Sequence, residues 1–272
     1  MPPVVTRELV ELPRVPTRTR RGAGALFPPM VAFVVLLGGW ELYVRVRNVK
    51  SLVLPAPSKI ARAVLEDRSG WVAAAWVTGQ EAFFGFLIAL GVALALAVAA
   101  TTTRSVERAV LPVVTVVQLI PVVALAPALV IGLGFGMWPR VLVAGLIAFA
   151  PLTVNAIAGM QAVDADALEL LRSVDASRWE ILVRLRLPHS VPYLVAAARV
   201  CVGLALIGAM VAEWQGSSAG LGYTFSRAQR TLATERMWAA VFVLAIMGVA
   251  ALGGIALLER RLLRWRPGRL RN

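Results

Sequence analysis

Cysteine and histidine are almost absent from this chain of 272 residues, which holds one of each, Cys201 and His189. One cysteine excludes an intrachain disulfide and a cysteine-based metal cluster. One histidine argues against a membrane-embedded enzyme, which needs clustered His, Asp, Ser or metal ligands. The segment Gly216-Ser-Ser-Ala-Gly220 matches the hydrolase nucleophile elbow, but no strand precedes it and His189 falls on the opposite membrane face in the topology derived below. We therefore expect no catalytic residue and no metal site.

A nucleotide-binding P-loop is also missing. The motif requires Gly-x-x-x-x-Gly-Lys followed by Ser or Thr, and the one Lys-Ser pair, Lys50-Ser51, follows Val49. This chain therefore has no P-loop with which to hydrolyse ATP, and any ATP-driven process must rely on a separate subunit.

Charged residues are scarce, at 16% of the chain, whereas 59% are apolar and the mean hydropathy is +0.76. Such values exclude an ordinary soluble domain. A membrane-spanning helix needs about 20 apolar residues. The sequence holds six such runs and predicts an all-α integral membrane protein with six transmembrane helices, at Ala25–Val44, Thr78–Ala100, Ala109–Gly132, Trp138–Met160, Tyr193–Glu213 and Met237–Leu258.

The formal net charge is +13, from 28 basic and 15 acidic residues. In a soluble protein this excess would suggest nucleic acid, but here it orients the helices, because cations are retained on the cytoplasmic side. With both termini inside, 17 loop and tail cations are cytoplasmic and 10 are external, while Arg199 lies within a helix. We expect two cytoplasmic termini, a basic tail at residues 1–24, a transmembrane domain at 25–272 and no nucleic-acid partner.

Two loops are too long to be simple turns. The first, external, contains Leu54-Pro-Ala-Pro-Ser58 and then a short helix that we expect Ser58 to cap. The second, residues 161–190, is cytoplasmic and mixes five acids with four arginines while keeping a helical spacing of apolar residues. It predicts two short amphipathic helices joined at residues 175–177. The alternative, a helix lying on lipid, is less favoured because such helices are usually basic.

This second loop resembles the cytoplasmic loop of permease subunits of binding-protein-dependent ABC importers, with its pattern Glu-Ala-Ala, three residues, Gly, nine residues, Ile, one residue, Leu-Pro. Glu169 takes the Glu position, and Leu187-Pro188 closes the motif. Leucines replace the alanines, Leu185 replaces the Ile, and Asp175 replaces the Gly. Aspartate tolerates a left-handed turn, so the bend is expected to persist.

The resemblance continues along the chain toward the nitrate, sulfonate and taurine type of permease. It rests on Leu54–Ser58, Gly85-Phe86, Gln118, Ile120-Pro121, Ala126-Pro127, Phe149, Pro151, Asn155, Gly159, Ala212-Glu213 and Gly220-Leu-Gly-Tyr223. Glu81 stands where anion-transporting relatives more often have arginine. Together with Ala212–Ser217 it is closer to members that handle vitamin precursors, such as the thiamine pyrimidine or riboflavin.

The resemblance implies a type I (MetI-like) importer permease in a bacterial cytoplasmic membrane, surrounded by lipid. It implies a second permease copy, two cytoplasmic ATPase subunits that hold ATP and Mg, and an extracytoplasmic solute-binding protein, with no cofactor bound by this chain. The residues that it places against the ATPase are Asp164, Asp166, Glu169, Leu170, Arg172, Asp175, Arg178, Leu187 and Pro188. Those that it places against the binding protein are Gly220, Leu221, Gly222 and Tyr223.

Polar residues inside the apolar runs are costly and therefore candidates for function. The candidates for the translocation path are Gln118, Pro121, Asn155 and Glu213, with an interhelical hydrogen bond as the alternative role of the two amides. Glu41, Glu81 and Glu213 lie near outer helix ends, where we expect them to reach water. An ion-driven secondary transporter is the competing function, and the sequence leaves the solute open.

Overall fold

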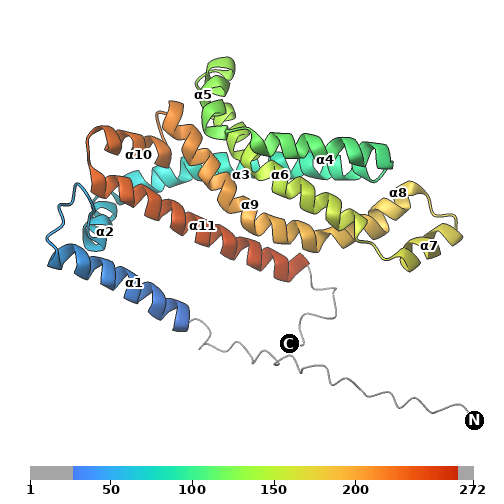
Figure 1. Cartoon of the computed structure of the whole chain (residues 1–272), viewed down its shortest axis with the longest axis horizontal. Coiled ribbons are helices and arrows are strands. Elements are labelled where there is room, and N and C mark those ends of the chain that lie inside the picture. The colour runs from blue at the N-terminus through green and yellow to red at the C-terminus, as the bar shows by residue number, and fades with distance from the viewer. Residues whose placement is uncertain (1–26, 263–272) are drawn as a thin grey trace, which may run out of the picture.

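The computed structural model describes residues 27–262, and within that range the regular elements are all helices (Figure 1). The basic tail expected at residues 1–24 and the end of the expected domain beyond 262 lie outside the described residues. The elements are α1 (Phe27–Val46), α2 (Pro57–Glu66), α3 (Arg68–Ala100), α4 (Arg104–Leu119), α5 (Val122–Leu133), α6 (Met137–Gln161), α7 (Ala165–Ser173), α8 (Arg178–Ile181), a π-helical turn (Leu182–Arg186), α9 (Leu187–Gly216), α10 (Leu221–Arg230) and α11 (Thr234–Leu262).

Each predicted apolar run is helical, and several helices extend beyond their run. Four helices in the described part are long and apolar enough to cross a membrane: α3, α6, the continuous segment Arg178–Gly216 and α11. Helix α1 covers the described part of the first run, residues 27–44, and is not among these four. The 33 residues of α3 begin at Arg68, ten residues before the predicted start, where the Asp67 side chain caps the helix by accepting the Gly70 N–H.

The third run is not one helix, and the prediction of a single span at Ala109–Gly132 is wrong in this respect. Helices α4 and α5 meet at 92°, so together they form one bent span or a re-entrant segment. The break falls at Ile120, whose ψ of 122° is extended, immediately before Pro121. A proline disfavours helical geometry in the residue before it, which explains the position of the break.

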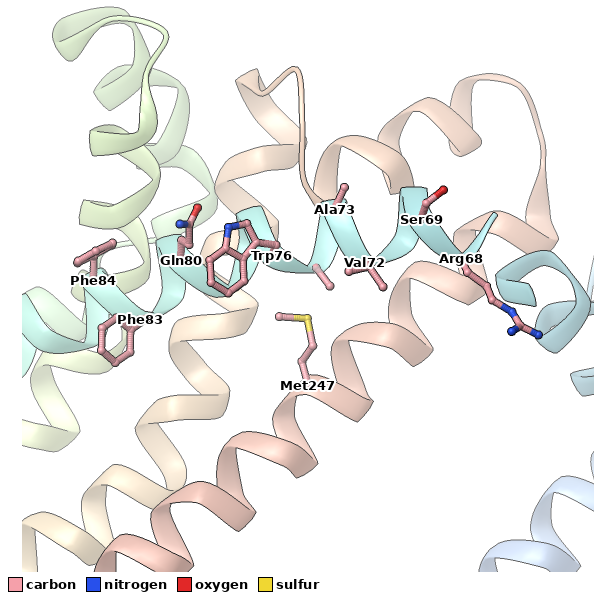
Figure 2. Close-up of a pocket in the computed structure, with 11 residues that line it drawn as sticks. Arg68, Ser69, Val72, Ala73, Trp76, Gln80, Phe83, Phe84 and Met247 are labelled. Atoms are coloured by element: carbon pink, nitrogen blue, oxygen red, sulfur yellow. The ribbon is translucent and has the colours of Figure 1, made fainter. Parts of the chain in front are cut away.

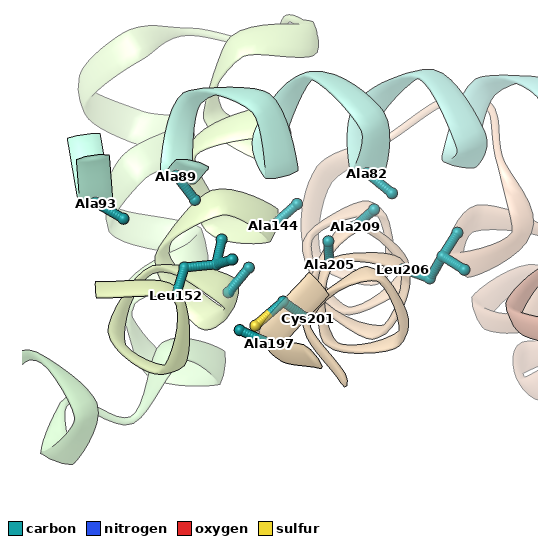
Figure 3. Close-up of a cluster of buried hydrophobic side chains, with 11 residues drawn as sticks. Ala82, Ala89, Ala93, Ala144, Leu152, Ala197, Cys201, Ala205, Leu206 and Ala209 are labelled. Carbon is teal, nitrogen blue, oxygen red and sulfur yellow. The ribbon is translucent and has the colours of Figure 1, made fainter. Parts of the chain in front are cut away.

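Helices α3, α6 and α9 form the centre of the bundle, and mostly small side chains fill the space between them (Figure 3). Small residues let helix backbones approach closely, which favours association in lipid, where burial of larger apolar groups gives little extra driving force. The buried cluster consists of Ala82, Ala89, Ala93, Ala144, Ala148, Leu152, Ala197, Cys201, Ala205, Leu206 and Ala209.

The closest approach of these helices occurs at three glycines. A Cβ on Gly85 of α3 would lie 2.6 Å from the carbonyl oxygen of Val141 in α6. A Cβ on Gly145 would lie 2.8 Å from the Gly85 carbonyl, and one on Gly208 of α9 would lie 2.8 Å from the Cα of Ala144. No larger residue fits these crossings without moving a backbone.

The long loops fold largely as predicted. In the cytoplasmic loop, α7 and α8 are joined through Asp175, whose φ of 54° confirms the expected left-handed turn. Ser177 and Glu180 form a capping box at the start of α8. In the external loop the prediction that Ser58 caps α2 is wrong: Ala56 is the N-cap, Pro57 begins the helix, and the Ser58 hydroxyl and N–H both donate to Glu41 of α1.

The glycine crossing predicts a position-specific loss of stability on one helix. Gly85→Leu is expected to lower the free energy of unfolding by about 1 to 3 kcal/mol, because its side chain cannot enter the crossing without separating α3 from α6. Gly91→Leu, also on α3 but with no atom within 4 Å of its added Cβ, is the matched control and is expected to change little. Thermal unfolding of the purified chain in detergent compares them, and equal melting temperatures would contradict the assigned contact.

Candidate functional site

Three charged side chains meet inside the bundle, one from each central helix: Glu81 of α3, Arg140 of α6 and Glu213 of α9. We call this group the buried charge cluster. A nitrogen of the Arg140 guanidinium lies 2.6 Å from Oε1 of Glu81, and the Glu81 and Glu213 carboxyl groups interact electrostatically. Glu81 and Glu213 are each 1% exposed. Arg140 also donates to the Ser217 hydroxyl at 2.6 Å, so its guanidinium links Glu81 of α3 to the residue that follows α9.

The cluster also anchors the start of α10. Glu213 accepts hydrogen bonds of 2.6 Å from the Gly222 N–H and from the Thr78 hydroxyl, and the Thr78 oxygen accepts the Leu221 N–H at 2.9 Å. The Leu221 and Gly222 N–H groups, which have no partner within α10, are thereby hydrogen-bonded. The Glu213 carboxyl also lies at the N-terminus of α10, the positive end of the helix dipole. Gly220 has a φ of 99°, and a Cβ there would lie 2.2 Å from Glu213, so glycine is required at this turn.

The burial of these acids overturns one prediction. Glu81 and Glu213 were expected to reach water from outer helix ends, but both point into the bundle, because Arg140 and the α10 backbone supply partners there. Arg140 was counted only as a loop cation. Arg140 is the one basic residue between Arg108 and Arg172, and Glu81 is likewise isolated among apolar residues. Two isolated opposite charges in apolar stretches are the pattern from which their pairing could have been predicted.

Other polar residues that the sequence singled out lie outside this cluster. Gln118 is exposed near the end of α4, and Pro121 marks the break before α5. Asn155 is half-buried and donates to the Pro151 carbonyl within its own helix, at 2.9 Å, rather than to a neighbouring helix. Glu213 alone of the expected path residues belongs to the cluster.

The four residues expected to meet a binding protein are unequally accessible. Gly220, Leu221 and Gly222 are buried against α9 and α3, whereas Tyr223 is half-buried. Tyr223 lines a pocket of about 310 Å³ together with Thr224, Arg227 and Arg236. The outward surface of this region is therefore Tyr223 and the exposed side of α10.

The cytoplasmic loop has two different sides. On one side of α7, Asp166, Glu169 and Leu170 are exposed, Leu170 by 67%, and the neighbouring Val174 is exposed to the same degree. Leu168, which points away from Leu170, and the exposed Arg172 line a pocket beside the end of α3. Figure 1 shows α7 and α8 beyond the ends of the bundle helices, opposite to α10.

The other residues expected to contact the ATPase cap helices, form a turn or pack against the bundle. Asp164 caps α7 by accepting the Asp166 N–H. Leu187 packs partly buried against the cluster that contains Met160, and Pro188 lies in the first turn of α9, where its missing N–H costs little. Asp175 supplies the turn described above, and Arg178 begins α8.

A large pocket of about 1150 Å³ runs along the outer half of α3 (Figure 2). Trp76, Phe83 and Phe84 of α3 line it, with Met247 of α11 opposite. Gln80 is the one polar side chain in its central part. A wall of this composition offers few partners to a polar solute and suits contact with lipid chains or another apolar helix.

Comparison with known proteins decides the family. Residues 88–264 match the model of the binding-protein-dependent transport system inner membrane component. The chain belongs to this family. It is 32% identical over 240 residues to the formylaminopyrimidine transport permease protein ThiX of Halalkalibacterium halodurans, covering 88% of this chain and 95% of that one. It is 32% identical over 257 residues to the riboflavin transport system permease protein RibX of Chloroflexus aurantiacus, covering 93% and 95%.

Further relatives agree with this assignment. The taurine transport system permease protein TauC of Escherichia coli is 28% identical over 244 residues, covering 85% of this chain and 86% of that one. A chain of the MetNI methionine ABC transporter superposes with a TM-score of 0.55 at 20% identity, covering 71% of this chain and 94% of that one, which confirms the MetI-type fold. This protein is a multi-pass permease subunit of an ABC importer, and its relatives are transport permeases rather than enzymes.

The buried charge cluster predicts a strong dependence on Arg140. Arg140→Leu leaves the Glu81 carboxyl buried without its cation and is expected to cost about 3 to 5 kcal/mol of stability. Glu81→Leu combined with Arg140→Leu removes the pair together and is expected to recover most of that loss. Thermal unfolding in detergent measures both, with exposed Arg230→Leu as the control, and a double variant no more stable than Arg140→Leu would count against the pairing.

Proposed function

We propose that this permease works as a pair of identical copies, energised by two cytoplasmic ATPase subunits that hold ATP and Mg and supplied with solute by an extracytoplasmic binding protein. The observation that carries the proposal is the exposed side of α7, where apolar and acidic side chains stand together beyond the end of the bundle. The family match supports partners of these two kinds.

The exposed side of α7 has the chemistry of a docking surface. Leu170 and Val174 present apolar area to solvent, which is costly unless a partner covers it. Glu169 and Asp166 beside them supply charges that orient a basic partner surface. We infer that the ATPase seats on this side of the loop, with Asp164 and Asp175 shaping it. Arg172, three residues after Glu169 on α7, and Arg178 at the start of α8 line the pocket beside this surface, and both are exposed.

The orientation follows from the distribution of cations, 17 inside against 10 outside when both termini are cytoplasmic. It places α7 in the cytoplasm and α10 on the external surface, at the opposite end of the molecule in Figure 1. On that surface Tyr223 and the exposed Arg227 and Arg230 of α10 are available to a binding protein. Gly220, Leu221 and Gly222 support this helix from beneath.

The solute that we propose is a small organic compound such as a vitamin precursor or nitrogen heterocycle. Neutral amides at Gln118 and Asn155 can hydrogen-bond carbonyl or ring nitrogen groups, whereas a bare anion would favour arginine. Relatives named for formylaminopyrimidine and riboflavin transport are each 32% identical, against 28% for the one named for taurine, which supports the same choice. Uptake of nitrate, sulfonate or taurine is the alternative solute class, and transport driven by an ion gradient in the purified chain alone would contradict the ATPase requirement.

Charge reversal in the cytoplasmic loop tests the docking surface. Glu169→Lys is expected to reduce ATPase-coupled transport about tenfold or more, because a cation replaces the carboxylate in the contact. Reconstituted transport and co-purification of the ATPase measure the effect. Glu66→Lys makes the same change on the exposed surface of external α2 and is expected to have no effect on coupling. Normal assembly and transport with Glu169→Lys would remove this surface from the mechanism.

Removing the Gln118 amide tests the translocation path. Gln118→Leu is expected to lower the transport rate about fivefold, as for the loss of one hydrogen bond, without changing which solute is preferred. Uptake of several solutes with the binding protein unchanged gives both quantities. An altered order of preference would show that the permease itself selects, and an unchanged rate would place Gln118 outside the path.

A further inference from the structure

Three arginines line one pocket at the cytoplasmic end of the molecule. The pocket has a volume of about 520 Å³ and lies between the end of α3, the inner side of α7 and the helix that begins with α8. Arg172 of α7, Arg178 of α8 and Arg186 of the π-helical turn contribute to its lining. We call it the three-arginine pocket.

Within the part of the chain that the structure describes, these arginines have no acidic partner. Among residues 27–262, no carboxylate lies within 4 Å of the guanidinium of Arg172, Arg178 or Arg186. The neighbouring Arg184, which does not line the pocket, pairs with Glu180. Guanidinium groups gathered in one partly shielded pocket repel one another, so an external anion stabilises the arrangement. The pocket therefore has the charge of an anion site.

The shape of the donor groups favours a phosphate. The planar guanidinium presents paired N–H groups that match two oxygens of a phosphate, and several arginines can share its charge. The oxygens of Thr101 and Thr102 also face this region, although both hydroxyl groups donate to carbonyls of α3. The arginines are therefore the donors that would hold the anion.

The remainder of the lining is apolar, which distinguishes a lipid from a free ion. Val98, Leu168, Ile181 and Leu182 form this part, and Trp179 stands 70% exposed. A soluble phosphate gains nothing from such a wall, whereas a phospholipid can place its headgroup on the arginines and its glycerol and upper chains on the apolar side chains. Tryptophan beside the pocket is typical of the membrane–water interface.

The position of the pocket fits the same ligand. The apolar α3 helix ends at Ala100, and the pocket lies beside its last turns, at the level where a spanning helix leaves the membrane. In the proposed orientation this is the cytoplasmic leaflet, whose anionic lipids attract clustered basic residues.

We propose that the three-arginine pocket binds the phosphate headgroup of an anionic phospholipid. The bound lipid bridges Arg172 of α7 and Arg186 at the start of the α9 helix beside the end of α3, and thereby holds the cytoplasmic loop against the bundle. Arg172 follows Glu169 by three residues on α7 and lines the pocket together with Leu168, whereas Leu170 points away from it.

Binding of defined lipids to the purified full-length chain tests the proposal. The probe is phosphatidylglycerol, measured by native mass spectrometry and by the shift in melting temperature in mild detergent. Replacing both Arg172→Gln and Arg186→Gln is expected to weaken phosphatidylglycerol binding about thirtyfold, from the contribution of each basic residue near an anionic headgroup. Arg184→Gln, which removes an arginine already paired with Glu180, is the matched control and is expected to bind like the unaltered chain.

Control variants and control ligands show whether the phosphate belongs to a lipid and whether the variants are folded. Arg172→Lys with Arg186→Lys keeps the charge but loses the paired donors, and intermediate binding is expected from a chain that elutes as a folded species. Phosphatidylcholine with the same acyl chains and soluble glycerol phosphate are each expected to give little protection. Equal protection by glycerol phosphate would overturn the lipid source, and equal protection by phosphatidylcholine would overturn the anionic requirement.

Two other outcomes would also overturn the proposal. Unchanged phosphatidylglycerol binding in the Gln double variant would show that the pocket is not the site. Loss of the ATPase subunit from that variant, with lipid binding intact, would show that an acidic surface of the ATPase occupies the pocket instead. Because lipid binding is measured on the chain alone, a failure of the proposed ATPase docking at Glu169 would not alter its result.

Discussion

The structure depends on the close crossing of α3, α6 and α9 at Gly85, Gly145 and Gly208. Because no side chain separates these backbones, residues four or five positions away from each glycine, toward the same end of the bundle, are also brought together. Those residues are Glu81, Arg140 and Glu213. Burial of such charges in a membrane protein is tolerated only with close partners, and the glycine crossing is what makes the partners close.

The cluster extends this constraint to the external surface. Through Thr78 and Glu213 it satisfies the first N–H groups of α10, and through Arg140 it contacts Ser217 in the preceding turn. Helix α10 is therefore bound to α3 and α9 by hydrogen bonds, and the turn before it to α6, and not only by apolar packing. A force on α10 from outside acts on all three central helices, whereas α4 and α5 are connected to each other by a proline break that can bend independently.

The sequence predicts the helices better than it predicts their partners. Hydropathy and the loop motif are local patterns, and they located the apolar runs, the two helices of the cytoplasmic loop and the left-handed turn at Asp175. The sharp break at Pro121, the capping of α2 and the burial of Glu81 depend on contacts between distant residues, such as Ser58 with Glu41 or Arg140 with Glu81. A single sequence contains the charges of the cluster but not the crossing that brings them together.

One continuous helical segment connects the end of the molecule that carries α7 with the end that carries α10. From Arg178 to Gly216 the chain is continuously helical over 39 residues, which corresponds to about 58 Å at 1.5 Å per residue. It begins beside the proposed ATPase contact and ends beside Glu213, so a displacement of the loop reaches the charge cluster without crossing a flexible joint. Pro192 lies inside that path and removes one backbone hydrogen-bond donor from it. A π-helical turn at Leu182–Arg186 also lies in it, and such turns often occur at functional sites. It also carries Arg186 of the three-arginine pocket. An anionic headgroup bound there would fix the end of the helix that must move, so lipid and ATPase would act on the same element.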